Sequence, residues 1–402
     1  MQNLKLLLEP SRLTEEQYSQ FSLVKQLMTQ RCQAHFFDLN LAASITAGYV
    51  LDIDTIVKRG IKQPEASNVN RKLLDVERIR QEDKIRANAK QAEWQIKASE
   101  LYHRELKKDI DQQITERPLV ILGRALPDLV KVIYDPNTDY KKLVKVIGQS
   151  DILTDGILRF IVREQRKGNY TKIDIKTQSM QAIIGQIGKA TLDDILPLLL
   201  IQQMVDVDGG VRRAGAEARF KRLISYNVSY ANAILNTLGK EHPYRRLGGL
   251  LGALDGLCSI IVYRLFCERQ DEVRIRLMDT WRNQSQHTLH TALQSVDINF
   301  NVLGVWCNDF KSKIQELLIQ QLDWSHIRPL RRALEEHQEI LPLHERSQLG
   351  VIVNHSYQFA QFKLLADSKL AGKSLATQYF YGSYIPNDLS RLLLSSSTME
   401  FV

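Results

Sequence analysis

One stretch constrains the fold more than any other, because residues 68–116 contain neither proline nor glycine. The absence of both helix breakers over so long a span, together with dense charges of both signs, predicts one long α-helix. Within it, apolar or small side chains recur at spacings of three and four, which places them in one narrow stripe similar to a coiled-coil seam. The members of this stripe are Ile85, Ala89, Ala92, Ile96, Ser99, His103, Leu106, Ile110 and Ile114.

Small side chains in this stripe (Ala89, Ala92 and Ser99) make the seam weak by itself. Two arrangements therefore stay open: self-association through the helix, or packing of the helix against the rest of the protein. His103 also falls within the stripe, and we interpret it as a tolerated packing residue rather than as a metal ligand.

The remainder of the chain predicts helices as well. Ten prolines and twenty glycines are few for 402 residues, and most of them separate long amphipathic stretches, which is typical of helices rather than of many short strands. Hydrophobic residues make up 44% of the chain and charged residues 25%, so disorder is not expected to be the main state. We predict an all-α protein with an N-terminal helical segment (1–67), the long charged helix (68–116), a multi-helix domain (118–365) and a C-terminal tail (366–402). The tail is expected to be partly ordered through packing of its aromatic side chains, Tyr379, Phe380, Tyr381 and Tyr384.

Cysteine usage and the N-terminal residues bear on location. The four cysteines show no CxxC spacing, so neither a disulfide framework nor a zinc site is indicated. The first ten residues, MQNLKLLLEP, contain an apolar run too short for the core of a secretory signal. We therefore expect a cytoplasmic protein.

Residues 247–266 approach the length and hydropathy of a membrane-spanning helix. Asp255 lies near the middle of this segment and Arg264 near its end, and both charges would be costly in hydrocarbon. We predict a buried core helix here and no membrane span.

The chain carries a formal net charge of +8 and a pI of about 9.1. Such an excess favours association with polyanions, among them nucleic acids and nucleotides. The basic residues are scattered rather than concentrated in one run, so we interpret most of them as solvated helix faces. Binding of nucleic acid or nucleotide through a basic surface stays an alternative function.

Several stretches in the second part of the chain resemble one known family. Residues 153–159 read LTDGILR, residues 179–188 read SMQAIIGQIG, and residues 249–257 read GLLGALDGL. Together with 223–238 and a closing stretch at 349–365, they resemble in order and spacing the HDOD domain. This bacterial signalling domain is a relative of the HD metal phosphohydrolases. Gly188 is placed to supply a left-handed cap.

This resemblance covers about residues 118–365 and implies an HD-like helical fold, but the chain departs from the parent enzymes at the metal. Gly252 and Ala253 stand where those enzymes carry the His-Asp dyad, and Ser225 stands at an earlier histidine position. None of these side chains offers the ligand set that a phosphohydrolase metal needs. Asp255 aligns with a glycine of the family and cannot replace the dyad. The resemblance therefore implies no catalytic residue, no metal ligand and no cofactor.

Five other histidines could in principle form a different metal site. His287 and His290 lie three residues apart on an expected helix and could face one ion. His337, His344 and His355 are spread over the region after Pro329. No acidic residue stands at a diagnostic spacing from either group, so we interpret all five as ordinary helix histidines.

Motif searches and two basic stretches give little more. The chain contains no GxxxxGK[ST], GxGxxG, GxSxG or HExxH. Residues 207–213 (VDGGVRR) could grip a phosphate through exposed backbone amides, and residues 326–332 (HIRPLRR) form a second basic cluster. We interpret both as loops leading into basic helix starts.

The preferred hypothesis is a non-catalytic bacterial signalling or interaction protein on a degenerate HD fold. The long helix at 68–116 suits self-association or contact with a partner protein. The alternatives are nucleic-acid or nucleotide binding and a phosphohydrolase with a rebuilt metal site.

Overall fold

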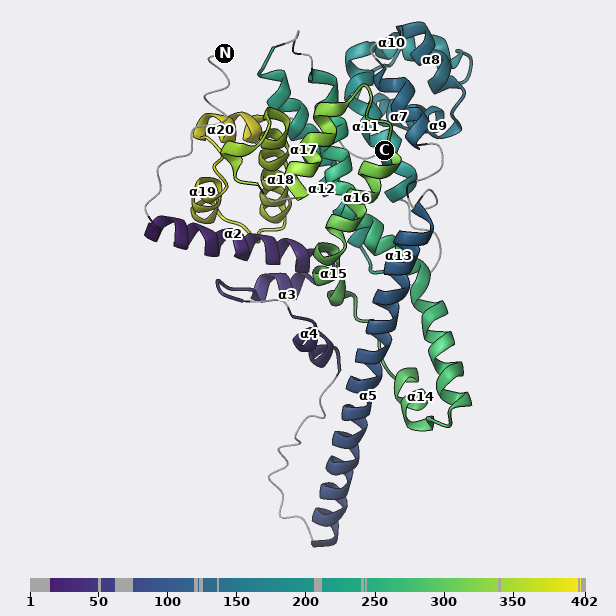
Figure 1. Ribbon diagram of the computed structural model, residues 1–402, viewed down its shortest axis with the longest axis vertical. Helices are drawn as coiled ribbons and strands as arrows, with labels where there is room; N and C mark the ends of the chain where they lie inside the picture. The colour runs from purple at the N-terminus through teal and green to yellow at the C-terminus, as the bar shows by residue number, and fades with distance from the viewer. Residues whose placement is uncertain are drawn as a thin grey trace.

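A computed structural model describes residues 15–49, 52–61, 75–118, 122, 126–135, 137–205, 212–239, 242, 244–338, 341–396 and 398. Over these residues the chain forms eighteen α-helices, three short 3-10 turns and no strand, so the predicted all-α class is confirmed (Figure 1). The helices are α2 (Glu15–His35), α3 (Leu39–Ser44), α4 (Ile53–Gly60), α5 (Asp75–Glu116), α7 (Leu126–Tyr134), α8 (Tyr140–Gly148), α9 (Asp151–Arg166), α10 (Met180–Ile187), α11 (Lys189–Val205), α12 (Ala216–Asn236), α13 (Gly248–Asn283), α14 (His287–Gln294), α15 (Leu303–Asp309), α16 (Lys311–Gln321), α17 (Arg328–Gln338), α18 (Gln348–Asp367), α19 (Lys373–Gly382) and α20 (Asn387–Ser395), and the 3-10 turns are η1 (Arg245–Leu247), η2 (Phe300–Val302) and η3 (Leu343–Glu345).

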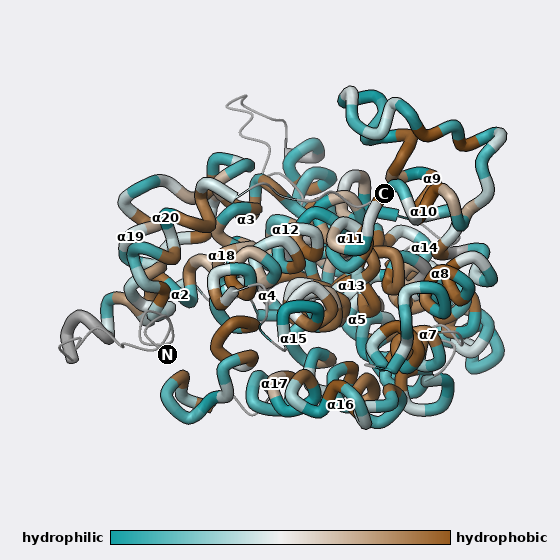
Figure 2. The backbone as a smooth tube through the Cα atoms, turned by 90° about the horizontal axis from the view of Figure 1, so that it is seen from above, coloured by the Kyte–Doolittle hydropathy of each residue, from teal (hydrophilic) through white to brown (hydrophobic). Residues whose placement is uncertain are grey.

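The centre of the protein is a layer of helices around α13. Helices α12 and α18 pack on each other and on α13, and α11 covers another side of it. Figure 2 shows that hydrophobic residues are concentrated around these helices and hydrophilic residues lie at the periphery. Residues from all four predicted segments contribute buried side chains to one continuous core, from Leu27 in α2 to Leu393 in α20.

Among the described helices, only α13 has the length and the apolar composition needed to cross a membrane. Within its most apolar window, 94% is buried inside the protein. Asp255 and Arg264 are buried with it, and Arg264 donates a hydrogen bond of 3.2 Å to the carbonyl of Met204. The prediction of a buried core helix at 247–266 is confirmed.

The long charged helix is α5, which runs for 42 residues, about 60 Å at the rise of an α-helix. The C-terminal half of the predicted stripe lies against the body of the protein, and its buried members are Ser99, His103, Leu106, Ile110 and Ile114. Toward the N-terminus the stripe becomes exposed, and Ile85 keeps 52% of its surface in solvent. Figure 1 shows this part of α5 extending beyond the other helices.

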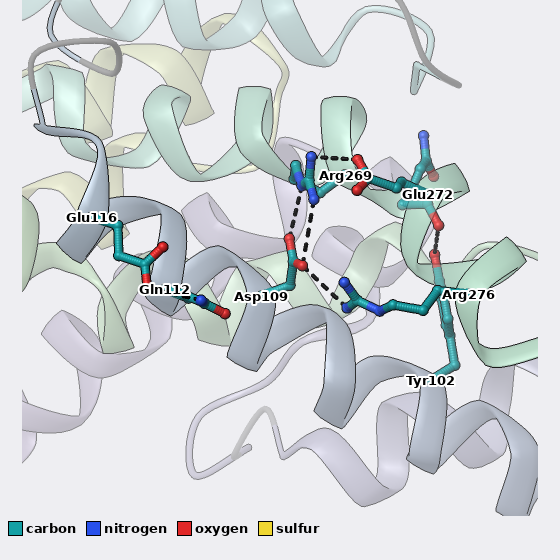
Figure 3. A network of polar contacts seen from close by, with 8 residues as sticks. Tyr102, Asp109, Gln112, Glu116, Arg269, Glu272 and Arg276 are labelled. Atoms are coloured by element: carbon teal, nitrogen blue, oxygen red, sulfur yellow. Dashed lines mark hydrogen bonds and ion pairs between the residues drawn. The ribbon is translucent and has the colours of Figure 1, made fainter. Parts of the chain in front are cut away.

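A buried carboxylate fastens α5 to α13. Asp109 is 5% exposed and accepts hydrogen bonds from Arg269 Nε at 2.8 Å and from Arg276 Nη2 at 3.1 Å. Arg269 also pairs with Glu272 on its own helix, and Tyr102 donates to the carbonyl of Gln270. Figure 3 shows these groups meeting between the two helices. Burial acts to raise the pKa of Asp109, but the two guanidinium groups outweigh it and hold the pKa below its ordinary value.

Local sequence signals explain where shorter helices begin and end. Ser179 caps α10 by accepting a hydrogen bond from the amide of Ala182. Gly188 ends this helix at a φ of 82°, as expected for a glycine terminator. Its ψ of 154° lies outside the left-handed helical region, so the predicted left-handed cap is wrong in that detail.

The C-terminal tail is helical and packs against α12 and α2 through α20 and α19. Tyr379 and Phe380 are buried, whereas Tyr381 is 39% exposed and Tyr384 is half-buried. Two of the four aromatic side chains expected to order the tail therefore do so from within the core.

Candidate functional site

The three positions that the HDOD resemblance aligns with metal ligands of the parent enzymes lie at the contact between α12 and α13. Gly252, Ala253 and Ser225 are all buried. The side-chain amide of Asn227 donates a 2.8 Å hydrogen bond to the carbonyl of Gly252. Its oxygen accepts one of 2.7 Å from Ser356 of α18. Three helices thus meet here through direct hydrogen bonds.

Backbone atoms of α12 fill the space beside Gly252. A Cβ atom placed on Gly252 would lie 2.8 Å from the Asn227 carbonyl oxygen and 3.0 Å from the Val228 nitrogen. One turn further along α13, a Cβ on Gly256 would lie 2.9 Å from Cγ1 of Ile224. Glycines at this spacing let the two helices approach closely, so the contact leaves no room for an imidazole at position 252.

Ionisable groups gather instead at Asp255, three residues beyond Gly252 on α13. Its side chain is fully buried. Lys311 of α16 places Nζ 3.5 Å from its Oδ1, and Gln315 donates from Nε2 to the same oxygen at 3.4 Å. Asp255 Oδ2 is buried without a hydrogen-bond partner among the described residues. The cluster therefore retains unused acceptor capacity.

His337 of α17 completes this cluster as a neutral imidazole. Its Nε2 lies 2.8 Å from Nζ of Lys311, and because an ammonium can only donate, Nε2 must accept and the ring proton sits on Nδ1. Burial, followed by the charge of Lys311, lowers the pKa of His337 to about 3. The 3.6 Å approach of Nε2 to Asp255 Oδ1 is accordingly not an ion pair.

A cavity of about 340 Å³ opens beside this cluster, between α2, α13, α15, α16, α17 and α18. Three cations line it, Lys25, Lys311 and Arg346, and none of its described lining residues is acidic. The other polar side chains on its wall are neutral: Thr29, Gln33, Ser259, Asn308, Ser312, Gln315, His337, Asn354, Tyr357, Gln358 and Gln361. We call this space the basic cavity.

Neither Lys25 nor Arg346 makes a direct ion pair with a carboxylate in the described part of the chain, although the charges of Glu336 and Asp255 favour the charged form of Arg346 from further away. Arg346 donates from Nε to the carbonyl of Leu341 at 2.6 Å, while its Nη1 is buried without a partner there. The ammonium of Lys25 makes no hydrogen bond or ion pair with a described residue. Burial, and then the charge of Arg346, lowers the pKa of Lys25. The like charges of Lys25 and Arg346 therefore repel each other at the wall of the basic cavity.

A larger cavity of about 960 Å³ lies between α9, α11, α12 and the C-terminal residues. Its charged lining residues are of both signs. Glu164 lies 3.6 Å from Arg163 and 3.1 Å from Lys167, so those charges offset one another. It carries no comparable excess of one sign, and the basic cavity is the stronger candidate site.

The structure scatters the remaining histidines considered as metal ligands. His287 and His290 are on the surface of α14, where His290 faces Arg282. His344 is exposed beside Glu345, and His355 is buried within α18. Of the five, only His337 joins the ionisable cluster. Among the described residues, no three His, Cys, Asp or Glu side chains gather closely enough to hold a metal ion.

The two basic stretches have local partners where the structure describes them. In residues 326–332, Arg331 pairs with Glu335 and Arg332 with Glu336, each one turn along α17, which supports the interpretation as a helix start. Of residues 207–213 only the last two lie within the described residues. There Arg213 donates to the carbonyl of Phe37 at 2.7 Å and so serves packing.

The three cations of the basic cavity carry no signal in the sequence. Lys25, Lys311 and Arg346 belong to α2, α16 and the turn before α18, and each is a single basic residue among ordinary helix-surface charges. No spacing in the sequence connects them. Neither the family models, nor the curated proteins, nor the solved structures compared with this chain match it.

Proposed function

We propose that this chain is a non-catalytic signalling or interaction protein of the cytoplasm, built on a degenerate HD-type fold similar to the bacterial HDOD domain. The observation that supports the non-catalytic part is the closed contact at Gly252. A metal phosphohydrolase needs ligands that converge on an open, hydrated ion. Here the carbonyl oxygen of Asn227 lies only 2.8 Å from the position that a Cβ atom on residue 252 would occupy.

Support for an interaction role comes from the distal arm, which we define as residues 77–93 of α5. None of its side chains is buried. It still carries two isoleucines more than half exposed, Ile79 at 55% and Ile85 at 52%. Large aliphatic side chains on a charged, projecting helix are typical of surfaces that self-associate or receive a partner helix.

Metal content and turnover test the non-catalytic part. The full chain would be purified without added metal, its divalent metals measured by elemental analysis, and its activity assayed on nucleotides and phosphodiesters with added Mn²⁺. The proposal predicts no stoichiometric metal and no turnover above that of a heat-inactivated sample. Tightly bound metal together with turnover would instead establish a phosphohydrolase with a rebuilt site.

Light scattering tests the interaction part. Removing α5 altogether would strip Leu106, Ile110 and Ile114 from the core, so point substitutions in the distal arm are the sharper tool. We expect Ile79→Glu with Ile85→Glu to reduce the mass of the particle eluting from a sizing column, or to abolish capture of a bound partner. A matched control is Ile275→Glu, which changes an equally exposed isoleucine, 61% accessible, on α13. Equal behaviour of both variants and the unmodified chain would reject the arm as an interaction surface.

A further inference from the structure

We infer that the basic cavity binds a small organic anion, a hydroxylated phosphate or carboxylate of metabolite size. This inference goes beyond the proposed function and does not depend on it. Its volume of about 340 Å³ lies at the lower end of the range of small-molecule sites. A site of this size excludes polymers and leaves a compact ligand.

The charged side chains on the wall of the basic cavity determine which sign of ligand charge the cavity favours. Lys25, Lys311 and Arg346 bring three positive charges to the wall of the cavity, against the single buried carboxylate of Asp255 beneath it. Glu336, the other nearby acid, is occupied by Arg332 and by two hydrogen bonds from Ser347. The balance is therefore an unpaired positive excess at a partly desolvated wall, which an anion would neutralise.

Lys25 and Arg346 are the groups expected to hold the anionic oxygens. Lys311 is already engaged by Asp255 and His337 and stacks over the ring of Tyr357 at 4.8 Å. By contrast, the Lys25 ammonium and Nη1 of Arg346 have no partner among the described residues. A guanidinium paired with an ammonium is a combination that suits both phosphate and carboxylate.

The neutral groups indicate that the ligand also carries hydroxyls. Gln315 lines the cavity, is 1% exposed and leaves Oε1 without a donor within the described chain. Asn354, Gln358 and Gln361 add further amides to the same wall. The oxygens of Gln358 and Gln361 already accept from the hydroxyl of Tyr379, so the oxygen that needs a donor is Oε1 of Gln315. A buried amide oxygen without a donor is costly, and a ligand hydroxyl group would supply that donor.

Isothermal titration calorimetry on the full chain tests this inference with three probes. Ribose 5-phosphate represents a phosphate, malate a carboxylate, and ribose an uncharged control. We expect saturable binding of one or both anions and none of ribose. The Lys25→Gln substitution should weaken that binding by about tenfold or more, because it removes a charge-assisted contact. Lys90→Gln, which removes an exposed lysine of α5, should leave it unchanged.

The thermal midpoint of the ligand-free protein supplies a second readout. Because Lys25 and Arg346 repel each other, Lys25→Gln should unfold at the same or a higher temperature than the unmodified chain while binding the anion less well. Lower affinity with undiminished stability is a signature of a binding residue. The inference is overturned if neither anion binds, if ribose binds equally, if Lys25→Gln binds as before, or if that variant melts at a lower temperature.

Discussion

Replacing Gly252 with alanine adds one methyl group at the tightest point of the α12–α13 contact. The new Cβ would meet three backbone atoms, with contacts of 2.8 Å to O and 2.9 Å to C of Asn227 and 3.0 Å to N of Val228. Backbone cannot swing aside as a flexible side chain does, so one helix must shift and the 2.8 Å bond from Asn227 to the Gly252 carbonyl is strained.

The magnitude follows from two opposing terms. Overpacking a core contact costs about 3 kcal/mol at the upper end of its usual range. Replacing a glycine inside a helix with alanine returns about 1 kcal/mol of helix propensity. We therefore expect Gly252→Ala to lower the free energy of unfolding by about 2 kcal/mol.

Gly185→Ala is the matched control. Gly185 is also inside a helix, α10, but a Cβ placed there has no atom within 4 Å. The same substitution should therefore raise the free energy of unfolding by about 0.5–1 kcal/mol. Urea unfolding followed by circular dichroism at 222 nm measures both. A Gly252→Ala variant as stable as the unmodified chain, or stabilised like the control, would refute a closed contact.

Three further predictions concern charge and burial. Asp109→Asn should lower the free energy of unfolding by about 2 kcal/mol in urea, because Arg269 and Arg276 lose their shared carboxylate and only Arg276 is well solvated; an unchanged urea midpoint would contradict this. The free energy of unfolding should also fall as the pH drops from 7 to 5. Burial lowers the pKa of three histidines in the folded chain below the ordinary 6.5, so the unfolded chain binds more protons in this range, and each histidine contributes a loss on the order of 1–2 kcal/mol. Equal urea midpoints at both pH values would contradict this prediction. The histidines concerned are His35 (about 4), His103 (about 4) and His337 (about 3). Finally, burial raises the pKa of all four buried thiols to about 12. Cys32 and Cys307 line the basic cavity, so the test uses the other two: a thiol-reactive disulfide reagent should label neither Cys258 nor Cys267 in the folded chain at pH 8 and both in urea, as mapped by mass spectrometry; rapid labelling of either in the folded chain would contradict its burial.

The spacing of apolar residues and helix breakers was enough to predict the helical class of the fold. The long helix, which the structure describes from Asp75 to Glu116, and the buried apolar helix at 247–266 were both predictable, because helix breakers and apolar spacing report local geometry directly. Residues 68–74 of the predicted helix lie outside the described residues. The surroundings of α5 were less predictable, because its apolar stripe is compatible both with self-association and with packing against the rest of the protein. In the structure, the C-terminal part of the stripe is buried in the core, as at Leu106 and Ile110, and the N-terminal part is exposed to solvent, as at Ile85.

The candidate site was far less accessible from sequence. The HDOD resemblance aligns Gly252 and Ala253 with a metal dyad, but whether the space at these two positions is open depends on how closely α12 approaches. That distance is set by glycines and by Asn227, which belong to different helices. The basic cavity depends on Lys25 and Arg346, which are 321 residues apart in the chain, and no single-sequence pattern links residues at such separation.

The closed contact at Gly252 is the central claim, and introducing the three ligand types that the proposed HD-type fold would carry at these positions tests it most directly. The triple variant Ser225→His, Gly252→His, Ala253→Asp would be titrated with Mn²⁺ by calorimetry and unfolded in urea beside the unmodified chain. We predict a large loss of stability, greater than that of Gly252→Ala, and no stoichiometric Mn²⁺ binding. A variant that folds as stably as the unmodified chain and binds one Mn²⁺ per molecule would contradict the claim.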